Sequence, residues 1–200
     1  PMILLHGLGA KPFTLWGLQT FFKTKGVKNV HNIGYPVNKY TFPDSLKYVH
    51  DKIMEKIGDK NTPINVIGHS FGGLIAINLH TMGLNINMVQ TLCSPLQSNF
   101  DIMKWADSKA SPIMKLINNP SYDHLRTKKC ELIPPHKYLT YSAGMWKSNN
   151  DLILKKHECI LPDNTRNDNH HHFYWTDHYS IPFNIFVQKK LYEDLLKADI

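Results

Sequence analysis

Ile64-Asn65-Val66-Ile67-Gly68-His69-Ser70-Phe71-Gly72-Gly73-Leu74 is the stretch that decides the fold. Residues 64–67 have the length and composition of a buried strand, and residues 74–82 follow with a helical pattern. A chain that turns sharply from strand to helix needs small residues two before and two after its serine, and such a turn holds the hydroxyl outward. The pattern therefore predicts a nucleophile at Ser70. The competing interpretation is a plain turn with Ser70 as the helix N-cap.

Strand-like and helix-like segments alternate on both sides of this turn. Such alternation predicts an α/β domain with a mostly parallel sheet and helices on both of its faces. A length of 200 residues suits one domain, residues 1–200. The expected strands are residues 2–5, 30–33, 64–67, 88–92, 138–141 and 157–161, and the expected helices are residues 15–22, 44–57, 74–82 and 185–196, with a polar loop at 162–179.

A second glycine-containing loop, His6-Gly7-Leu8-Gly9, directly follows the first expected strand. A serine that attacks an ester creates an oxyanion, which two backbone N–H groups must stabilise. The residue after the nucleophile, Phe71, is expected to supply one N–H group, and Leu8 the other. We expect the His6 side chain to brace this loop rather than to transfer protons.

With these two motifs, the chain resembles the α/β-hydrolase superfamily. Its short length and its H-G-x-G loop are similar to those of minimal bacterial-type lipases and lipase-like serine esterases. The resemblance implies an α/β-hydrolase fold in a minimal version that starts at the strand before the oxyanion loop. It also implies a chain order of serine, then acid, then histidine.

The resemblance implies Asp151 as the acid, because this residue follows the expected strand 138–141 and precedes three apolar residues. Three other aspartates remain candidates. Asp163 and Asp168 lie later, in the polar loop, while Asp177 adjoins the expected catalytic histidine and has little freedom to fold back on it. An ordinary turn carboxylate is the alternative interpretation of Asp151.

The catalytic base is expected to be His178, which stands on a loop just before the last helix. The run His170-His171-His172 is the alternative, as a base or as metal ligands. Neighbouring side chains of an extended chain point in opposite directions, so these three cannot all face one ion. We expect them in a solvated or partly stacked loop.

The stretch from residue 95 to 135 is broken by five prolines and rich in apolar residues. It predicts a cap or lid segment over Ser70, with an ordinary set of core helices as the alternative. Just before it, Cys93 is expected to be a small buried residue rather than a nucleophile. The three cysteines form no CxxC pair, which argues against a zinc site and favours reduced thiols.

The net charge of +7 comes almost entirely from lysine, since Arg126 and Arg166 are the only arginines. Scattered lysines without a basic block predict a solvated surface and no nucleic-acid partner, with attraction to an anionic lipid surface as the alternative. No apolar run reaches the ~18 residues that a membrane-spanning helix needs. The chain starts within an apolar segment, so we expect a targeting peptide to be absent or already removed. A cytoplasmic location is slightly favoured, and a secreted one stays open.

Together these features predict a serine hydrolase that cleaves carboxylic esters, favouring lipid esters, through an acyl-enzyme on Ser70. Neither a metal nor an organic cofactor is expected, because one imidazole and two amides handle the proton and the charge. A short-chain carboxylesterase or a thioesterase would use the same residues. A catalytically silent member that binds lipid or a protein partner is the alternative from another class. The sequence gives no indication of the oligomeric state.

Overall fold

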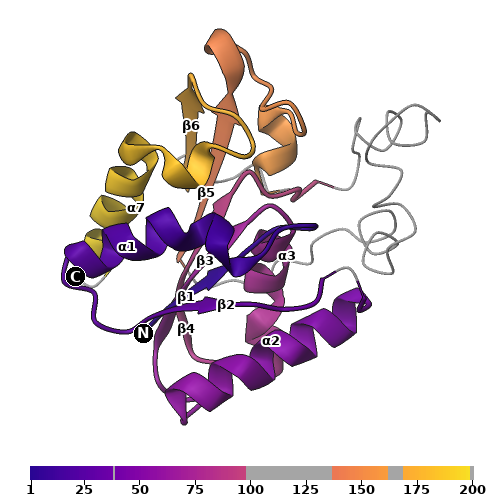
Figure 1. Cartoon of the computed structure of the whole chain (residues 1–200), viewed down its shortest axis with the longest axis vertical. Helices are drawn as coiled ribbons and strands as arrows, with labels where there is room; N and C mark the ends of the chain where they lie inside the picture. Colours follow the sequence, from indigo (N-terminus) through magenta and orange to yellow (C-terminus); the bar gives the residue numbers. More distant parts are fainter. Residues whose placement is uncertain (38, 98–136, 162–168, 199–200) are drawn as a thin grey trace.

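Six parallel strands form one sheet in the computed structural model, which describes residues 1–37, 39–97, 137–161 and 169–198. The strand order is β2-β1-β3-β4-β5-β6, and helices cover both faces (Figure 1). The strands are β1 (Met2–Leu5), β2 (Val30–Ile33), β3 (Ile64–His69), β4 (Ile86–Leu92), β5 (Lys137–Gly144) and β6 (His170–Tyr174). The α-helices are α1 (Trp16–Thr24), α2 (Phe42–Ile57), α3 (Phe71–Asn78) and α7 (Ile185–Ala198). Short 3-10 helices are η1 (Pro12–Leu15), η2 (Leu79–Met82), η3 (Met145–Lys147), η4 (Lys156–Cys159) and η6 (Ile181–Phe183).

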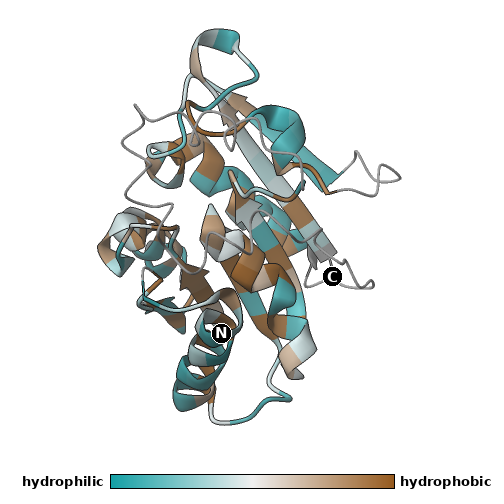
Figure 2. Cartoon of the chain, turned by 90° about the vertical axis from the view of Figure 1, so that its right-hand side faces the viewer, coloured by the Kyte–Doolittle hydropathy of each residue, from teal (hydrophilic) through white to brown (hydrophobic). Residues whose placement is uncertain are grey.

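The sheet separates two hydrophobic cores. Successive side chains of a strand point to opposite faces, so Ile3 and Leu5 of β1 join the core under α2 and α3, while Met2 and Leu4 join the core under α1 and α7. All four are buried, which explains why β1 is a continuous apolar run. Figure 2 shows the central strands as apolar and the outer side of α2 as polar. The predicted sheet with helices on both faces is thus confirmed.

The helix α2 begins and ends at recognisable residues. Thr41 is its N-cap and accepts a hydrogen bond from the N–H of Asp44 at 3.3 Å. Gly58 ends the helix with φ of +76° and donates its N–H to the carbonyl of Met54 at 2.9 Å. The helix starts two residues before its predicted beginning at residue 44.

The predicted last strand at residues 157–161 is wrong. Residues Lys156–Cys159 form the 3-10 helix η4, because the Glu158 carboxylate accepts the N–H of Lys155 at 2.6 Å and so curls the chain into a turn. The buried Glu158 also accepts the N–H of Leu96 at its carbonyl, at 2.8 Å. The apolar residues of this segment therefore do not indicate a strand.

The sixth strand is β6, which lies inside the predicted polar loop. Its histidines alternate between the two faces of the sheet and find polar partners there. His170 bonds to Thr140 at 2.7 Å and to Ser142 at 2.9 Å, while Nδ1 of His172 bonds to Ser142 at 2.7 Å. On the other face, Nε2 of His171 lies 3.3 Å from the Asp194 carboxylate. The expectation of a solvated or partly stacked loop at His170-His171-His172 is therefore wrong, because these residues form a half-buried strand whose side chains have polar partners on both faces.

Acid should weaken this edge of the sheet. Burial, aided by the charge of Lys156, lowers the pKa of His170 from its ordinary 6.5 to about 4. Below pH 6.5 the unfolded chain therefore binds a proton that the folded chain does not, and the free energy of unfolding falls as the pH drops toward 4. We expect His170 to contribute a loss on the order of 2 kcal/mol, measured by urea unfolding at pH 7 and pH 4.5. His170→Asn should flatten this dependence, and an equal loss in the variant would contradict the prediction.

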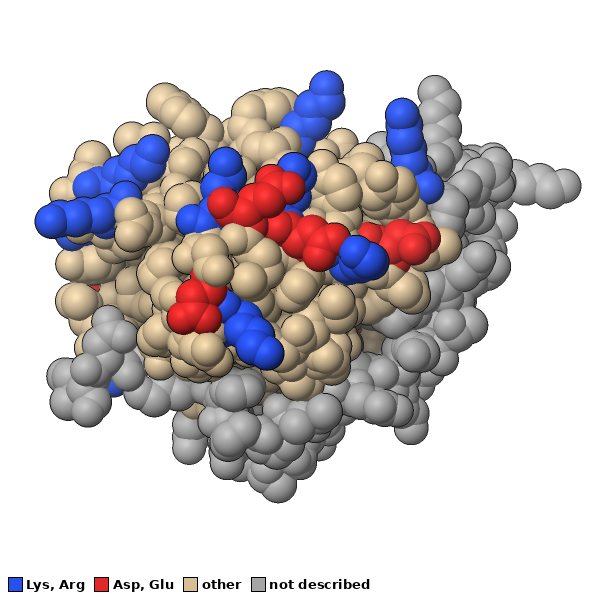
Figure 3. Space-filling model, turned by 90° about the horizontal axis from the view of Figure 1, so that it is seen from below, with Lys and Arg blue, Asp and Glu red and all other residues tan. Residues whose placement is uncertain are grey.

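The surface around α2 carries charges of both signs, side by side (Figure 3). Two ion pairs lie along this helix, Lys47 with Asp51 at 2.7 Å and Lys52 with Glu55 at 2.8 Å. Mixed charges of this kind are typical of a solvated helix face. None of the described helices is both long and apolar enough to cross a membrane.

Candidate active site

Ser70 occupies a strained turn between β3 and α3. Its φ of 53° and ψ of −122° lie outside the usual regions for a residue with a side chain. A Cβ on Gly68 would collide with the backbone of Gly72, and one on Gly72 would collide with the backbone of Leu5. Ser70 is partly exposed and makes no capping hydrogen bond to α3. The geometry therefore matches the predicted sharp turn, and Ser70 stands at the N-cap position of α3 without using its hydroxyl as a cap.

The loop after β1 lies directly against this serine. A Cβ on Gly7 would stand 2.9 Å from the Cβ of Ser70 and 3.4 Å from its Oγ, so glycine is what permits the close approach. Leu8 follows in this loop, and Phe71 opens α3 immediately after Ser70. Of the two residues predicted to supply the oxyanion N–H groups, one thus follows Ser70 in the chain, and the other follows Gly7, which lies against Ser70.

His6 and Tyr35 hold the loop after β1 in place. His6 is buried, and its Nδ1 donates to the Gly7 carbonyl at 3.0 Å. The Tyr35 hydroxyl donates to the His6 carbonyl at 2.5 Å, and the two rings stack with centroids 4.5 Å apart. Burial lowers the pKa of His6, although the bond to Gly7 opposes this, so the ring stays neutral at pH 7. The predicted bracing role suits this geometry, while the contribution of Tyr35 left no local signal in the sequence.

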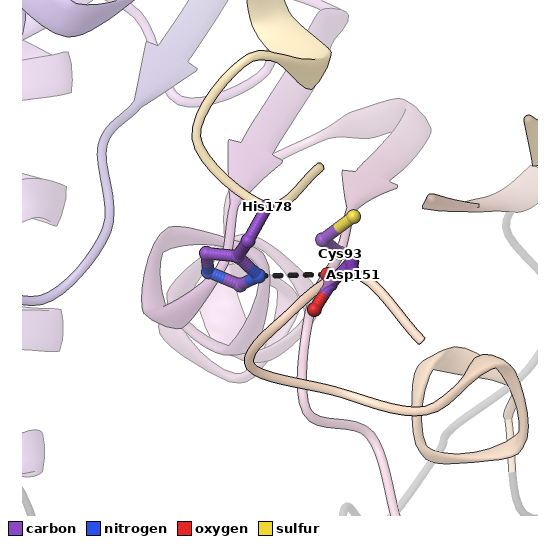
Figure 4. A group of neighbouring side chains, drawn as sticks. All are labelled: Cys93, Asp151 and His178. Carbon is purple, nitrogen blue, oxygen red and sulfur yellow. Dashed lines mark hydrogen bonds and ion pairs between the residues drawn. The ribbon is translucent and has the colours of Figure 1, made fainter. Parts of the chain in front are cut away.

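Asp151 and His178 meet in the structure, although 27 residues separate them. Figure 4 shows the His178 ring turned toward the Asp151 carboxylate, and the hydrogen bond between Nδ1 and Oδ2 is 2.8 Å long. The other carboxylate oxygen accepts the N–H groups of Ile153 at 2.9 Å and Leu154 at 2.6 Å. Asp151 is fully buried and His178 is 4% exposed. The carboxylate is therefore fixed from one side and presented to the imidazole from the other.

The charge of Asp151 is stabilised despite its burial. Burial alone would raise its pKa, but the hydrogen bond and charge of His178, followed by the Leu154 N–H, outweigh this effect and lower it below its usual value. An ionised carboxylate accepts a hydrogen bond from the Nδ1–H group of His178, and in the tautomer with its proton on Nδ1 the Nε2 atom is an acceptor.

A third histidine links the His178 loop to the serine turn. His69, adjacent to Ser70, lies close to His178, with Nε2 2.8 Å from the His178 carbonyl and ring centroids 5.0 Å apart. Complete burial, aided by the charge of His178, lowers the pKa of His69 to about 3. A neutral ring can donate only one N–H, so Nε2 carries the proton in this bond. The sequence offered no sign of this contact between residues 109 positions apart.

Cys93 completes the surroundings of Asp151. It follows β4 with φ of 44° and is fully buried, as predicted. Burial, followed by the charge of Asp151, raises the pKa of its thiol well above the usual range, so Cys93 stays protonated at neutral pH. Cys93 and Cys159 are both free thiols.

The alternative residues have other partners or fall outside the described residues. The Asp177 carboxylate accepts the N–H groups of Tyr179 at 2.8 Å and Ser180 at 3.0 Å, which shapes the loop around His178. Asp163 and Asp168 lie in residues 162–168, outside the described residues, as does most of the expected cap or lid at 95–135.

Comparison with known proteins identifies the fold. No protein-family model matches the sequence, and a search of curated proteins gave no match. The α/β hydrolase MGS-MChE2, from a sediment metagenome of the Mar Chica lagoon in Morocco, is 18% identical with a TM-score of 0.69, covering 100% of this chain and 92% of that one. The lipase BlEst2 of Bacillus licheniformis is 15% identical with a TM-score of 0.67, over 98% and 91%. The type II thioesterase BorB of the borrelidin biosynthetic cluster is 12% identical with a TM-score of 0.61, over 98% and 90%. The chain therefore has the α/β-hydrolase fold that its motifs predicted.

Proposed function

We propose that this chain is a serine hydrolase that cleaves carboxylic esters through an acyl-enzyme on Ser70. The observation that carries the proposal is the contact between Asp151 and His178 at 2.8 Å, on a loop that His69 ties to the Ser70 turn. Nucleophilic acyl transfer requires an exposed serine and an oriented imidazole, and here the strained Ser70 turn and the His178 loop are joined through His69. That solved structures of the same fold include a lipase and a thioesterase also supports it.

In the proposed reaction, Oγ of Ser70 attacks the ester carbonyl while Nε2 of His178 takes its proton. The Asp151 carboxylate holds the ring in the tautomer with Nδ1 protonated and stabilises the imidazolium that forms. The N–H groups of Leu8 and Phe71 stabilise the oxyanion. His178 then gives the proton to the leaving alcohol. In the second half of the reaction, water attacks the acyl-enzyme while Nε2 of His178 takes a proton from it, and His178 returns that proton to Oγ of Ser70 as the acid leaves.

Covalent labelling by a fluorophosphonate probe is the direct test. The probe phosphonylates an activated serine and loses fluoride, so the native chain should gain one adduct on Ser70, located by mass spectrometry of its peptides. Unfolded chain should not react, because activation depends on His178. Absence of an adduct on native protein would leave the catalytically silent alternative, a member that binds lipid or a protein partner.

A lipid ester is the substrate class that we favour. Exposed apolar residues stand on the two loops that bear the proposed acid and base: Trp146 is 73% exposed, Leu152 61% and Trp175 63%. The ring centroids of Trp146 and Trp175 are 5.4 Å apart. Tryptophan combines an apolar body with a polar N–H and favours the boundary between water and lipid. A short-chain ester or a thioester is the alternative substrate.

If the substrate is a lipid, aggregation of a long-chain p-nitrophenyl ester should raise its turnover severalfold at the aggregation threshold. Contact between the exposed tryptophans and the aggregate would concentrate the enzyme at the surface. Trp175→Ala should reduce this rise, whereas Leu196→Ala, which removes an exposed apolar side chain of α7, should not. Initial rates measured across the threshold with a short-chain and a long-chain ester decide the matter. A smooth saturation curve with preference for the short chain would identify a simple esterase.

A further inference from the structure

Three potential metal ligands of different chemistry converge beside the proposed catalytic histidine. Cys93, Asp151 and His178 follow β4, β5 and β6, which are neighbouring parallel strands and so end at the same edge of the sheet. Their sulfur, carboxylate oxygen and imidazole nitrogen all lie within 4.8 Å of one another (Figure 4). All three residues are buried. They are 58 and 27 positions apart in sequence, so no spacing motif announces them.

This set of ligands suits zinc. Zn²⁺ binds thiolate, imidazole and carboxylate in tetrahedral geometry at about 2.0–2.3 Å, which places the ligand atoms roughly 3.3–3.6 Å apart. The present separations, from 2.8 Å to at most 4.8 Å, bracket these values, so shifts of about 1 Å in the side chains would close the site. The N–H groups of Ile153 and Leu154 already fix the second oxygen of Asp151, as partners of a metal-binding carboxylate do.

The charge balance of the buried site also favours a divalent cation. Before the ion binds, the Asp151 carboxylate supplies one negative charge. On binding Zn²⁺, the Cys93 thiol releases its proton to solvent, and the two negative charges then neutralise the ion. A neutral cluster is easier to bury than an isolated charge. The imidazole adds no charge to the cluster, because the tautomer that binds a metal through Nδ1 carries its proton on Nε2.

We propose that Cys93, Asp151 and His178 form a binding site for Zn²⁺, and that zinc bound there blocks the hydrolase reaction. The second half of this statement rests on the proposed function, and the first half does not. Once Nδ1 binds the ion, Nε2 carries the proton and cannot accept one from Ser70. The Asp151 carboxylate then binds zinc instead of orienting the ring. Zinc is thus an inhibitor of this chain and not a catalyst.

Cobalt provides a direct test, independent of activity. Protein stripped with a chelator is titrated with Co²⁺, and a thiolate-to-cobalt charge-transfer band should appear, saturate at one ion per chain and disappear when Zn²⁺ is added. Cys93→Ser should weaken binding by about 100-fold or more, since loss of even an outer partner costs 10–100-fold. Cys159→Ser and Cys130→Ser, which change the other two cysteines, should keep the band. His178→Ala, which leaves the thiol in place, should weaken binding similarly and serves if Cys93→Ser does not fold.

Absence of the band in the wild type, or its survival in folded Cys93→Ser, would overturn the zinc site. So would its loss in Cys159→Ser or Cys130→Ser. Inhibition is tested separately: Zn²⁺ should slow fluorophosphonate labelling of the wild type by at least about tenfold, with slow onset because the ligands are buried, and a chelator should reverse it. Labelling of Cys93→Ala should not be slowed by Zn²⁺, relative to the rate of the same variant without metal. Labelling that is unaffected by saturating Zn²⁺ would overturn the inhibition. Cobalt binding in a chain that never reacts with the probe would instead refute the proposed function and leave the site standing.

Discussion

Ser70→Ala should lower ester turnover by about 10⁶-fold and abolish labelling by the fluorophosphonate probe, because the variant lacks the oxygen that forms the acyl bond. What remains would be the slow reaction with water that oxyanion stabilisation and substrate binding support. The fold should persist, since the Ser70 side chain caps no helix and alanine tolerates the turn about as well as serine does. Steady-state rates with a p-nitrophenyl ester and thermal unfolding of the same samples measure both effects.

Ser148→Ala is the matched control for this experiment. Ser148 is exposed, and among the described residues its hydroxyl bonds within its own loop, to Asn150. Its removal should change turnover by less than about threefold, because surface substitutions away from a site have small effects. Labelling of Ser70→Ala at the rate of the wild type would show that the nucleophile lies elsewhere.

Asp151→Asn should lower the turnover number by about 10⁴-fold. An asparagine can turn its amide N–H toward Nδ1 of His178, which favours the tautomer with the proton on Nε2 and leaves no acceptor for the Ser70 proton. The two N–H groups that Oδ1 accepts, from Ile153 and Leu154, are still satisfied by the amide oxygen, so the loop should keep its shape. Turnover under saturating ester, together with circular dichroism, separates the two effects.

Two other aspartates serve as comparisons for Asp151. Asp177→Asn should lower turnover by less than about tenfold, because the partners of its carboxylate in the described part of the chain are groups of its own loop, the N–H of Tyr179 and the N–H and hydroxyl of Ser180. Asp163→Asn should likewise be mild. A crippling loss at Asp163 with a mild loss at Asp151 would mean that the acid of the proposed triad has been misassigned.

Much of the fold was predictable because local patterns and tertiary packing agree. In β1 every residue is apolar, and the structure buries all four. Around Ser70, the sequence has glycine at the positions where a Cβ atom would collide with the backbone. In β6 the local sequence pattern and the tertiary packing disagree. Its histidines are packed through hydrogen bonds to Thr140 and Ser142, and such pairings depend on a strand 30 residues away, which no local periodicity reveals.

The candidate site divides in the same way. Ser70 and Gly7 stand in short motifs, and the contact between Asp151 and His178 follows the order that the family resemblance implied. The roles of Tyr35 and His69 could not be predicted from the sequence. Each acts on a backbone carbonyl, of His6 in one case and of His178 in the other, and a contact with a main-chain atom imposes no residue type on the partner.

The main chain of residue 178 is held independently of its side chain. Its N–H donates to the Asp151 carbonyl at 2.9 Å, and its carbonyl accepts from His69 at 2.8 Å. Both anchors would persist with any amino acid at this position except proline, which has no N–H to donate. The main-chain hydrogen bonds of residue 178 thus do not depend on which side chain the residue carries. A different base, or a non-natural imidazole analogue, could therefore be introduced at position 178 with the same two main-chain hydrogen bonds, provided that the residue keeps its N–H.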